Sequence, residues 1–410
     1  MRVEAGLREK EDELRVSSIE LFFDLVFVFT ITQLTALLAA KPDGESLAQI
    51  VLMLSAIWWM YAGFAWLTNA VPPERTALRL PLLAGMAAFF AISLSIPTAF
   101  TENGVVFAGA YLIVIAVHTV LYMQSASWSL AGVWLLARMN LAAAGLILAG
   151  SIIGGTWEYV LWGLTVLIFA VTPALVSEAG WIRPSHFVER HGLVVMVALG
   201  ESVVAVGIGA SGLDITWQLL AVATLGLTLS TELWWVYFMG DDEEAEGALR
   251  AMTPTRREFL AANVAYYWAH LLILLGIVCV AAALERAIGH AFDSLSFARA
   301  LALGGGTALY LAGHALFRRA LGLPFKPWRA VAFVLALGTV ALGPTTSALA
   351  QLAVLVAALG ACIVAEGAAS EGASGRRSQT LVRPSDSASQ TASSAAEPDL
   401  RAVVSGGKGP

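Results

Sequence analysis

Charged residues are scarce in this chain: Lys, Arg, Asp and Glu together make up 13% of its 410 residues, while 58% are hydrophobic. A soluble domain has about 25% charged residues. A chain this apolar has more apolar surface than a water-soluble core of its length can bury. The mean hydropathy of +0.75 points the same way. We therefore exclude a soluble globular protein and expect a lipid bilayer to cover much of the surface.

Cysteine pairs and concentrated positive charge are missing as well. Cys279 and Cys362 are the only cysteines and lie inside apolar runs, which argues against a disulfide framework and against a Cys/His metal pattern. The formal net charge is -6 at pH 7, and no basic patch marks a nucleic-acid-binding surface. Residues 207–212 match G-x-G-x-x-G, but they end an apolar run instead of joining a strand to a helix. The sequence predicts no metal, no cofactor and no nucleic acid partner.

The beginning of the chain lacks the pattern of a cleavable signal peptide. Such a signal has a basic leader and an uninterrupted apolar stretch. Here residues 1–17 carry acidic residues beside basic ones, and the first apolar run contains Glu20 and Asp24. We therefore expect the first run to remain in the protein as a membrane helix.

Long apolar runs are what the chain does have. A helix needs about 20 apolar residues to cross a bilayer. Twelve runs near this length occur, at residues 18–40, 46–70, 79–98, 104–124, 130–153, 157–178, 190–211, 215–239, 260–284, 295–317, 327–343 and 346–366. The sequence therefore predicts an all-α fold, a polytopic transmembrane bundle of about 12 helices.

The Lys and Arg residues predict an orientation, because positive charge is enriched in the cytoplasmic loops of membrane proteins. If the N-terminus is cytoplasmic, three of the 24 Lys and Arg residues, Lys41, Arg286 and Arg299, face outward and the other 21 face the cytoplasm. Removing one helix from the count would destroy this bias. We expect a multi-pass membrane protein with both termini in the cytoplasm.

Weak internal symmetry divides the predicted helices into two sets of six. The corresponding positions are Glu20 with Glu189, residues 57–61 with residues 233–237, and His118 with His314. We predict a six-plus-six tandem repeat whose halves share one orientation. The predicted division is a cytoplasmic segment at 1–17, six-helix repeats at 18–178 and 179–366, and a disordered cytoplasmic tail at 367–410.

Acidic residues inside the apolar runs are the strongest functional signal. Glu20 and Asp24 are four residues apart and share one face of the first helix. A charged side chain at mid-membrane costs about 2.5 to 3.5 kcal/mol on insertion scales, so such residues face a polar interior or a partner. Glu20 could instead sit at the interface, where the helix N-terminus favours negative charge. For Asp24 we expect a functional or structural ion pair within the bundle.

The seventh and eighth helices supply further charges. Glu189 and Arg190 lie at the mouth of the seventh helix, Glu201 follows Gly200 in mid-span, and Glu232 lies in the eighth helix. Asp24, Glu201 and Glu232 together predict a cavity that favours cations or relays protons. The alternative is a set of buried hydrogen bonds that only lock helices together.

Two histidines and a glycine triplet inside the runs also have two interpretations each. His118 and His314 predict proton handling, or neutral imidazoles hydrogen-bonded to a neighbouring helix. Residues 304–306 are three glycines without the Lys of a phosphate-binding loop, so we expect them to allow close helix packing. Gly200 is expected to do the same.

Two motifs resemble a known family. Residues 15–29 read RVSSIELFFDLVFVF, and residues 186–193 read HFVERHGL and lead to ALGES at 198–202. Together they are similar to the two signatures of the bacterial low temperature requirement protein A family, over about residues 13–366. The resemblance implies placement in the bacterial inner membrane and carries over the motif positions, but it implies no reaction. Residues 22–27 are also similar to the F-S-D motif of potassium channels built from six-helix repeats, with Phe23 in place of Ser.

The leading hypothesis is a transporter or channel that moves a small cation, proton or polar solute between the first and seventh helices. In it Asp24 and Glu201 contact the ion, and Glu20, Glu189 and Arg190 set the potential at the cytoplasmic mouth. One alternative is a membrane-embedded enzyme on a lipid or hydrophobic substrate, with His and Glu as acid and base. The other is a non-catalytic membrane sensor or scaffold. The residues favour a non-enzymatic role and leave the oligomeric state open.

Overall fold

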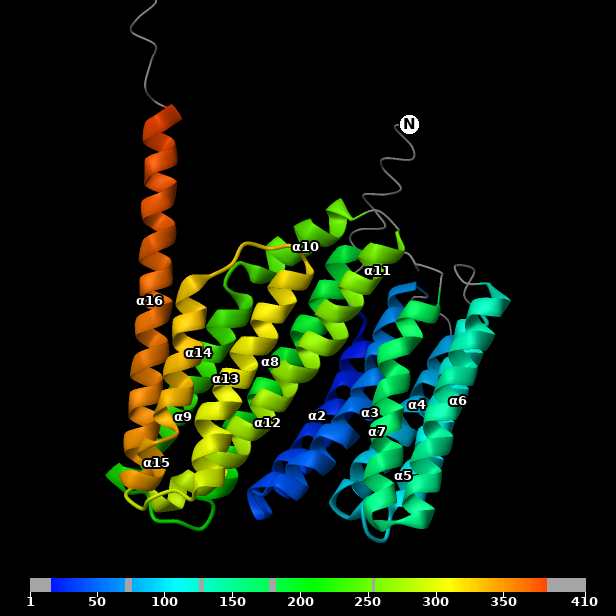
Figure 1. The fold of residues 1–410 in the computed structure, drawn as a ribbon, viewed down its shortest axis with the longest axis horizontal. Coiled ribbons are helices and arrows are strands. Elements are labelled where there is room, and N and C mark those ends of the chain that lie inside the picture. Colours follow the sequence, from blue (N-terminus) through cyan, green and yellow to red (C-terminus); the bar gives the residue numbers. More distant parts are fainter. Residues whose placement is uncertain (1–15, 71–75, 125–128, 177–181, 253–254, 382–410) are drawn as a thin grey trace, which may run out of the picture. The chain divides into compact units, whose positions relative to one another are not determined.

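The computed structural model describes residues 16–70, 76–124, 129–176, 182–252 and 255–381. The described residues are largely helical and contain no β-strand. Twelve helices among them are long and apolar enough to cross a membrane, as the sequence predicted. Figure 1 shows these helices as a bundle in which successive long helices are joined by short connections, so neighbours in sequence are antiparallel.

The helices follow the chain in two sets. The first set is α2 (Ser18–Ala40), α3 (Gly44–Ala70), α4 (Thr76–Ser95) with η1 (Ile96–Thr98), α5 (Gly104–Tyr122), α6 (Leu130–Ile153) and α7 (Gly155–Leu175). The second set is α8 (Pro184–Ala210), α9 (Trp217–Phe238), α10 (Asp241–Ala251), α11 (Arg256–Asn263), η2 (Val264–Ala269), α12 (His270–Ala287), η3 (Ile288–His290), α13 (Phe297–Ala320), α14 (Pro327–Thr339), α15 (Leu342–Thr345) and α16 (Ala348–Leu381).

The chain divides into two compact units, residues 1–363 and residues 364–410. The first unit contains all the sites discussed below. The described part of the second unit is the remainder of α16, which continues past Gly367, where we predicted the end of order, to Leu381. Extending an existing helix adds a hydrogen bond per residue without a new nucleation cost. The rest of the predicted tail lies outside the described residues.

Two helix boundaries differ from the prediction. α8 begins at Pro184 instead of residue 190, because proline is well suited to the first turn of a helix. After α9 the chain turns at Gly240, whose φ of 89° lies in the left-handed region that glycine adopts without strain. The acidic segment that follows, which lies between the predicted runs 215–239 and 260–284, forms α10.

The two sets share a pattern of neighbours. In the first set α2 packs on α4, α4 on α5 and α5 on α6; in the second set α8 packs on α12, α12 on α13 and α13 on α14. The first helix of each set thus contacts the third, the third the fourth, and the fourth the fifth. This agreement fits a tandem duplication, which stays a prediction. The two sets meet through α2, α3, α8 and α12.

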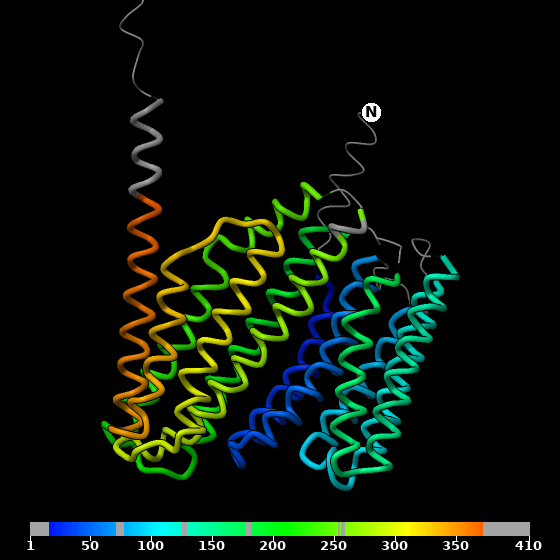
Figure 2. Tube along the Cα trace, viewed as in Figure 1, coloured from blue at the N-terminus to red at the C-terminus, as the bar shows by residue number. Residues whose placement is uncertain are grey.

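The most buried spans are α3 and the segment from α11 to α12. In their most apolar stretches 78% and 83% of the residues are buried inside the protein, against 33% for α6 and α7. These two spans form the centre of the bundle, and the others turn apolar side chains outward. In Figure 2 the trace passes from α11 through the π-helix η2 into α12. Because π-helical segments are frequently found at functional sites, the neighbours of η2 are candidates for a site.

Glycines bring α12 and α13 close together. A Cβ added at Gly276 would lie 2.7 Å from the carbonyl oxygen of Gly306, and one at Gly304 would lie 2.6 Å from the carbonyl oxygen of Ala336. Close packing through residues 304–306 is therefore confirmed. Gly200 is different, because nothing lies within 4 Å of an added Cβ, so the expected close approach there is wrong.

Candidate functional site

Four charged or titratable side chains meet between the first helices of the two sets. Glu20 and Asp24 of α2 face His186 and Arg190 of α8. An Arg190 Nη atom lies 3.2 Å from Asp24 Oδ1, another lies 3.5 Å from Glu20 Oε1, and His186 Nε2 lies 3.3 Å from the same oxygen. All four are buried, with exposed fractions of 1 to 6%. We call these four residues the charge cluster, and the α2–α8 contact the seam.

Local structure explains how α2 presents its acids. Ser17 caps the helix, and its backbone N–H and hydroxyl donate hydrogen bonds to Glu20 at 2.9 and 2.7 Å. This reciprocal arrangement satisfies free backbone groups at the helix start. One turn further, the hydroxyl of Tyr61 in α3 donates to Asp24. Ser17 therefore holds Glu20 from the start of the same helix, and Tyr61 holds Asp24 from a neighbouring helix.

Neighbouring side chains also fix the basic partners. Asn69 of α3 accepts a hydrogen bond from the Arg183 backbone N–H at 2.9 Å, and its Nδ2 lies 3.4 Å from His186 Nδ1. The guanidinium carbon of Arg190 lies 5.8 and 5.7 Å from the ring centres of Phe23 and Tyr61. Aromatic faces attract a cation at such distances. Three helices, α2, α3 and α8, thus build the charge cluster.

The charge cluster is not electrically balanced by its arginine alone. Two carboxylates share one permanent cation, so a proton on His186, a proton on one acid or a bound cation would be needed to neutralise it. Glu20 Oε1 and Asp24 Oδ2 accept no hydrogen bond from a described residue. The contacts of Glu20 Oε1 with His186 and Arg190 are ion pairs at longer distances. A cavity of 10 Å³ is lined by Glu20 and Arg190, and this is about the volume that one water requires.

Glu201 lies further along the same seam. The Thr32 hydroxyl of α2 donates to Glu201 Oε2 at 2.6 Å, and the residue is 1% exposed. The other oxygen, Glu201 Oε1, accepts no hydrogen bond from the described residues. The hydroxyl of the adjacent Ser202 also has no hydrogen-bond partner among them. With a rise of about 1.5 Å per residue, Glu201 lies roughly 16 Å along α8 from Arg190. The seam thus carries acids at two depths.

Two predicted residues lie away from the seam. Glu189 is exposed and lines a hollow of 250 Å³ together with Asp242, Glu243 and Glu246, between α8 and the α9–α10 corner. Glu232 of α9 points toward α16, where a Cβ added at Gly360 would lie 2.8 Å from its carboxylate. Of the three acids that we predicted to lie together, only Asp24 and Glu201 are therefore on the α2–α8 pair, and Glu232 is not.

The two intramembrane histidines occupy different surroundings. His118 of α5 packs against Gly63 of α3, where an added Cβ would lie 2.9 Å from Nε2. That nitrogen has no hydrogen-bond partner among the described residues. His314 of α13 instead joins a second charged group, because its Nε2 lies 2.8 Å from Asp241 Oδ2.

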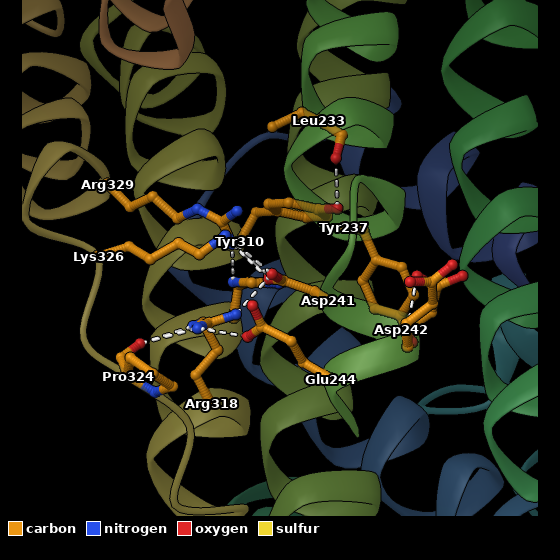
Figure 3. Close-up of polar contacts among 12 residues, drawn as sticks. Leu233, Tyr237, Asp241, Asp242, Glu244, Tyr310, Arg318, Pro324, Lys326 and Arg329 are labelled. Carbon is orange, nitrogen blue, oxygen red and sulfur yellow. Dashed lines mark hydrogen bonds and ion pairs between the residues drawn. The ribbon is translucent and has the colours of Figure 1, made fainter. Parts of the chain in front are cut away.

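Asp241, at the start of α10, is the centre of that second group (Figure 3). Arg318 Nη1, Arg329 Nη1 and Lys326 Nζ lie 2.5, 2.6 and 3.1 Å from its oxygens. Arg318 also reaches Glu244 at 2.8 Å. Asp241 is 1% exposed. We call the six residues of this group the Asp241 network: Asp241, Glu244, His314, Arg318, Lys326 and Arg329.

Sequence reasoning missed the Asp241 network because Asp241 belongs to an acidic run that looks like a loop. A signal was available: Asp241 follows Tyr237 by four residues, and Arg318 follows His314 by four. Each pair shares a helix face when the chain stays helical. The Gly240 turn interrupts the first pair, so only the three-dimensional structure brings the four residues together.

Buried imidazoles lie between the charge cluster and the Asp241 network. His191, one residue after Arg190, is 0% exposed and its Nδ1 donates to the Phe187 carbonyl at 2.9 Å. His270 Nδ1 lies 2.8 Å from the Ala265 carbonyl, so Nε2 is free to accept from the Tyr237 hydroxyl at 2.8 Å. The rings of His191 and His270 are 5.4 Å apart. In the described part of the chain, no three His, Cys, Asp or Glu side chains are arranged to hold a metal ion.

Comparison with known proteins agrees with the motifs. A family model described as bacterial low temperature requirement A protein matches residues 15–364, which include both motifs. A protein of Rhizobium meliloti (strain 1021), named Uncharacterized protein RA0937, is 27% identical over 336 residues, or 76% of this chain and 79% of its own length. No solved structure matches. The charge cluster and Glu201 both fall within the matched residues.

Proposed function

Because the chain belongs to the bacterial low temperature requirement A family and has 12 helices long enough to cross a membrane, we propose that it is an integral membrane transport protein. The proposed cargo is a small cation, a proton or another small polar solute. The proposed path follows the seam between α2 and α8, at the junction of the two helix sets.

The observation that carries this proposal is the burial of acids on both sides of the seam. Glu20, Asp24 and Glu201 are each at most 3% exposed. A buried ion pair is often no more stable than hydrophobic residues of the same volume. Ionisable residues inside membrane segments therefore mark ion or proton pathways by default. Structural locking alone would need no unsatisfied carboxylate oxygens, whereas each of these three acids has one.

The acids have separate proposed roles. Glu201 is the group that binds the cation or proton, since its free oxygen has no competing partner among the described residues. The charge cluster is the closed gate at the end of the seam where α2 and α8 begin. Arg190 contacts both acids of α2. A cation that binds one of these acids would displace the guanidinium from it, and the guanidinium would then contact only the other acid. Binding at the gate and opening of the gate would then be coupled.

Flux measurements in proteoliposomes test the proposal. The purified full chain is reconstituted, and uptake is followed under imposed proton, sodium and potassium gradients. We expect Glu201→Gln to abolish flux and Glu232→Gln, a membrane carboxylate outside the seam, to leave it nearly unchanged. Equal flux in wild type and in Glu201→Gln together with Asp24→Asn would remove both assigned roles.

The geometry at Glu201 does not favour the enzyme alternative, because the group that donates a hydrogen bond to this carboxylate is the hydroxyl of Thr32. An acid–base pair with histidine would need a ring nitrogen within hydrogen-bond reach. The sensor or scaffold alternative predicts that the carboxylate variants lose stability while no gradient drives flux in wild type. The same reconstitution therefore separates the alternatives.

We also propose the bacterial inner membrane as the location, with both termini in the cytoplasm. The distribution of Lys and Arg supports this orientation. Arg183 precedes the start of α8, Arg318 lies near the end of α13, and Lys326 precedes the start of α14. These helix ends lie at the same end of the bundle as the start of α2, uppermost in Figure 1. We call this the basic end; it would face the cytoplasm and would carry the gate.

A further inference from the structure

A second hollow lies away from the seam, between α3, α5, α6, α7 and the α11–η2 segment. The hollow is partly open, and about 70 Å³ of it admits the centre of a water-sized sphere. None of the residues of the charge cluster or the Asp241 network lines it, so it is distinct from the proposed transport path.

Aromatic rings form much of the wall and are themselves fixed by neighbours. Trp59 stacks on Phe169 at 4.8 Å and meets Tyr267 edge-on at 5.2 Å. Trp66 meets Phe259 edge-on at 5.3 Å. Rings held on both sides cannot easily collapse into the hollow. A flat, mostly apolar molecule would meet preformed surfaces there.

Two amide side chains interrupt this apolar wall. The Asn140 oxygen accepts a hydrogen bond from Trp59 Nε1 at 2.9 Å. Because an indole nitrogen only donates, this contact fixes the orientation of the amide and leaves Nδ2 as a donor elsewhere. Asn140 is 2% exposed, and its Nδ2 makes no hydrogen bond to a described residue. The Asn263 side chain, just before the π-helix, likewise bonds to none of them.

An amide donor that faces a mainly apolar hollow gains from an acceptor placed there. In a hollow lined mainly by rings, the occupant that supplies one is an apolar molecule with an oxygen acceptor. We propose that this hollow is a binding site for a small, largely aromatic ligand that carries a carbonyl oxygen. The rings of Trp59 and Trp66 hold its body, and the Asn140 amide donates to its carbonyl. This inference does not depend on the proposed transport function.

Benzophenone is a suitable probe, because it has two rings and one carbonyl and forms covalent adducts with adjacent C–H groups under light. The purified full chain is labelled over a range of concentrations, and the adducts are mapped by mass spectrometry. We expect saturable labelling of the peptides that contain Trp59–Trp66 or Thr172–Val176, which flank the hollow. Diphenylmethane, which has the rings without the oxygen, is expected to compete at least about tenfold less well, the loss of one modest hydrogen bond.

Variants separate the parts of the inference. Ala62 lines the hollow, and Ala62→Phe should abolish the saturable labelling by filling it. Asn140→Leu should raise the half-saturating concentration about tenfold or more, with Asn263→Leu as the second amide variant. Thermal unfolding confirms that each variant is folded; if Asn140→Leu is not, Asn263→Leu and the diphenylmethane competition decide. Equal labelling of wild type and Ala62→Phe would overturn the site. Unchanged labelling in the folded amide variants, or equal competition by diphenylmethane, would overturn the carbonyl-binding chemistry.

Discussion

Arg190 of α8 lies 3.2 Å from the carboxylate of Asp24 of α2, and this contact joins the first helices of the two six-helix sets. Both residues are at most 2% exposed. The guanidinium also contacts Glu20 at 3.5 Å. One buried cation therefore holds two acids across the junction of the two sets.

Removing this cation should be far more costly than removing a surface cation. Arg190→Met leaves Glu20 and Asp24 buried without their arginine, and we expect a loss of about 3 to 5 kcal/mol in the free energy of unfolding. Thermal and denaturant unfolding in detergent micelles measure the change. Arg138→Met is the matched control, because Arg138 is exposed. Similar stability of the two variants would show that the charge cluster does not hold the seam together.

The hydroxyl of Thr32 should matter for the affinity of Glu201. Thr32→Val removes the 2.6 Å donor to the carboxylate, a bond to a charged group that contributes about 1.5 to 3 kcal/mol. We expect the half-saturating cation or proton concentration for flux to change at least about tenfold, with a smaller effect on stability. Thr228→Val is the control, since Thr228 is partly buried in α9 and its hydroxyl bonds only within that helix. Identical saturation curves would argue against Glu201 as the binding group.

The Asp241 network should stabilise the corner between α9 and α10. Asp241→Asn leaves Arg318, Lys326 and Arg329 crowded around a neutral side chain, and we expect a loss of about 3 kcal/mol or more in unfolding free energy. Glu243→Gln changes an exposed acid in the same helix and should be nearly neutral. Limited proteolysis near α10 provides a second measurement. An unfolding midpoint that moves equally in both variants contradicts the prediction.

Glycine packing between α12 and α13 gives a prediction that involves no charge. Gly276→Ala places a Cβ 2.7 Å from the Gly306 carbonyl oxygen, so the helices must separate, and we expect a loss of about 1 to 3 kcal/mol. Gly200→Ala has open space around the new atom and should be neutral or stabilising by up to about 1 kcal/mol, because alanine is the better helix former. Thermal unfolding of the two variants side by side tests the contrast, and an equal response would mean that the α12–α13 contact is loose.

Cysteine labelling tests the proposed orientation. Both native cysteines are buried, while Glu102, between η1 and α5, and Glu243, in α10, are exposed. The connection between α4 and α5 and the helix α10 lie at opposite ends of the bundle in Figure 1. A membrane-impermeant maleimide should label Glu102→Cys in intact spheroplasts and should label Glu243→Cys only after the membrane is permeabilised. The reverse pattern would place the basic end outside the cell.

Hydropathy was sufficient to predict the helices, because a membrane span is a local property of about 20 residues. The cost of a lone charge was sufficient to predict that Asp24 has a partner, and the structure identifies that partner as Arg190. The sequence could not say which acids face each other. Glu232 and Glu201 look alike in sequence, yet one points toward α16 and the other toward α2.

The features that were missed depend on contacts between distant segments. Asp241 becomes buried only because the Gly240 turn lays α10 against α13 and the segment before α14. The π-helix η2 has no distinctive sequence pattern, although it positions Tyr267 in the wall of the hollow. The earlier start of α8 could have been predicted from Pro184, which favours a first helical turn.

The order of synthesis gives the charge cluster a further consequence. A ribosome delivers α2 with its two acids long before it delivers the arginine of α8, after the whole first set has emerged. During that interval the acids must either take up protons or keep α2 from settling fully into the bilayer. A nascent chain that stops before α8 therefore carries two acids in its first helix without the arginine that contacts them in the complete chain.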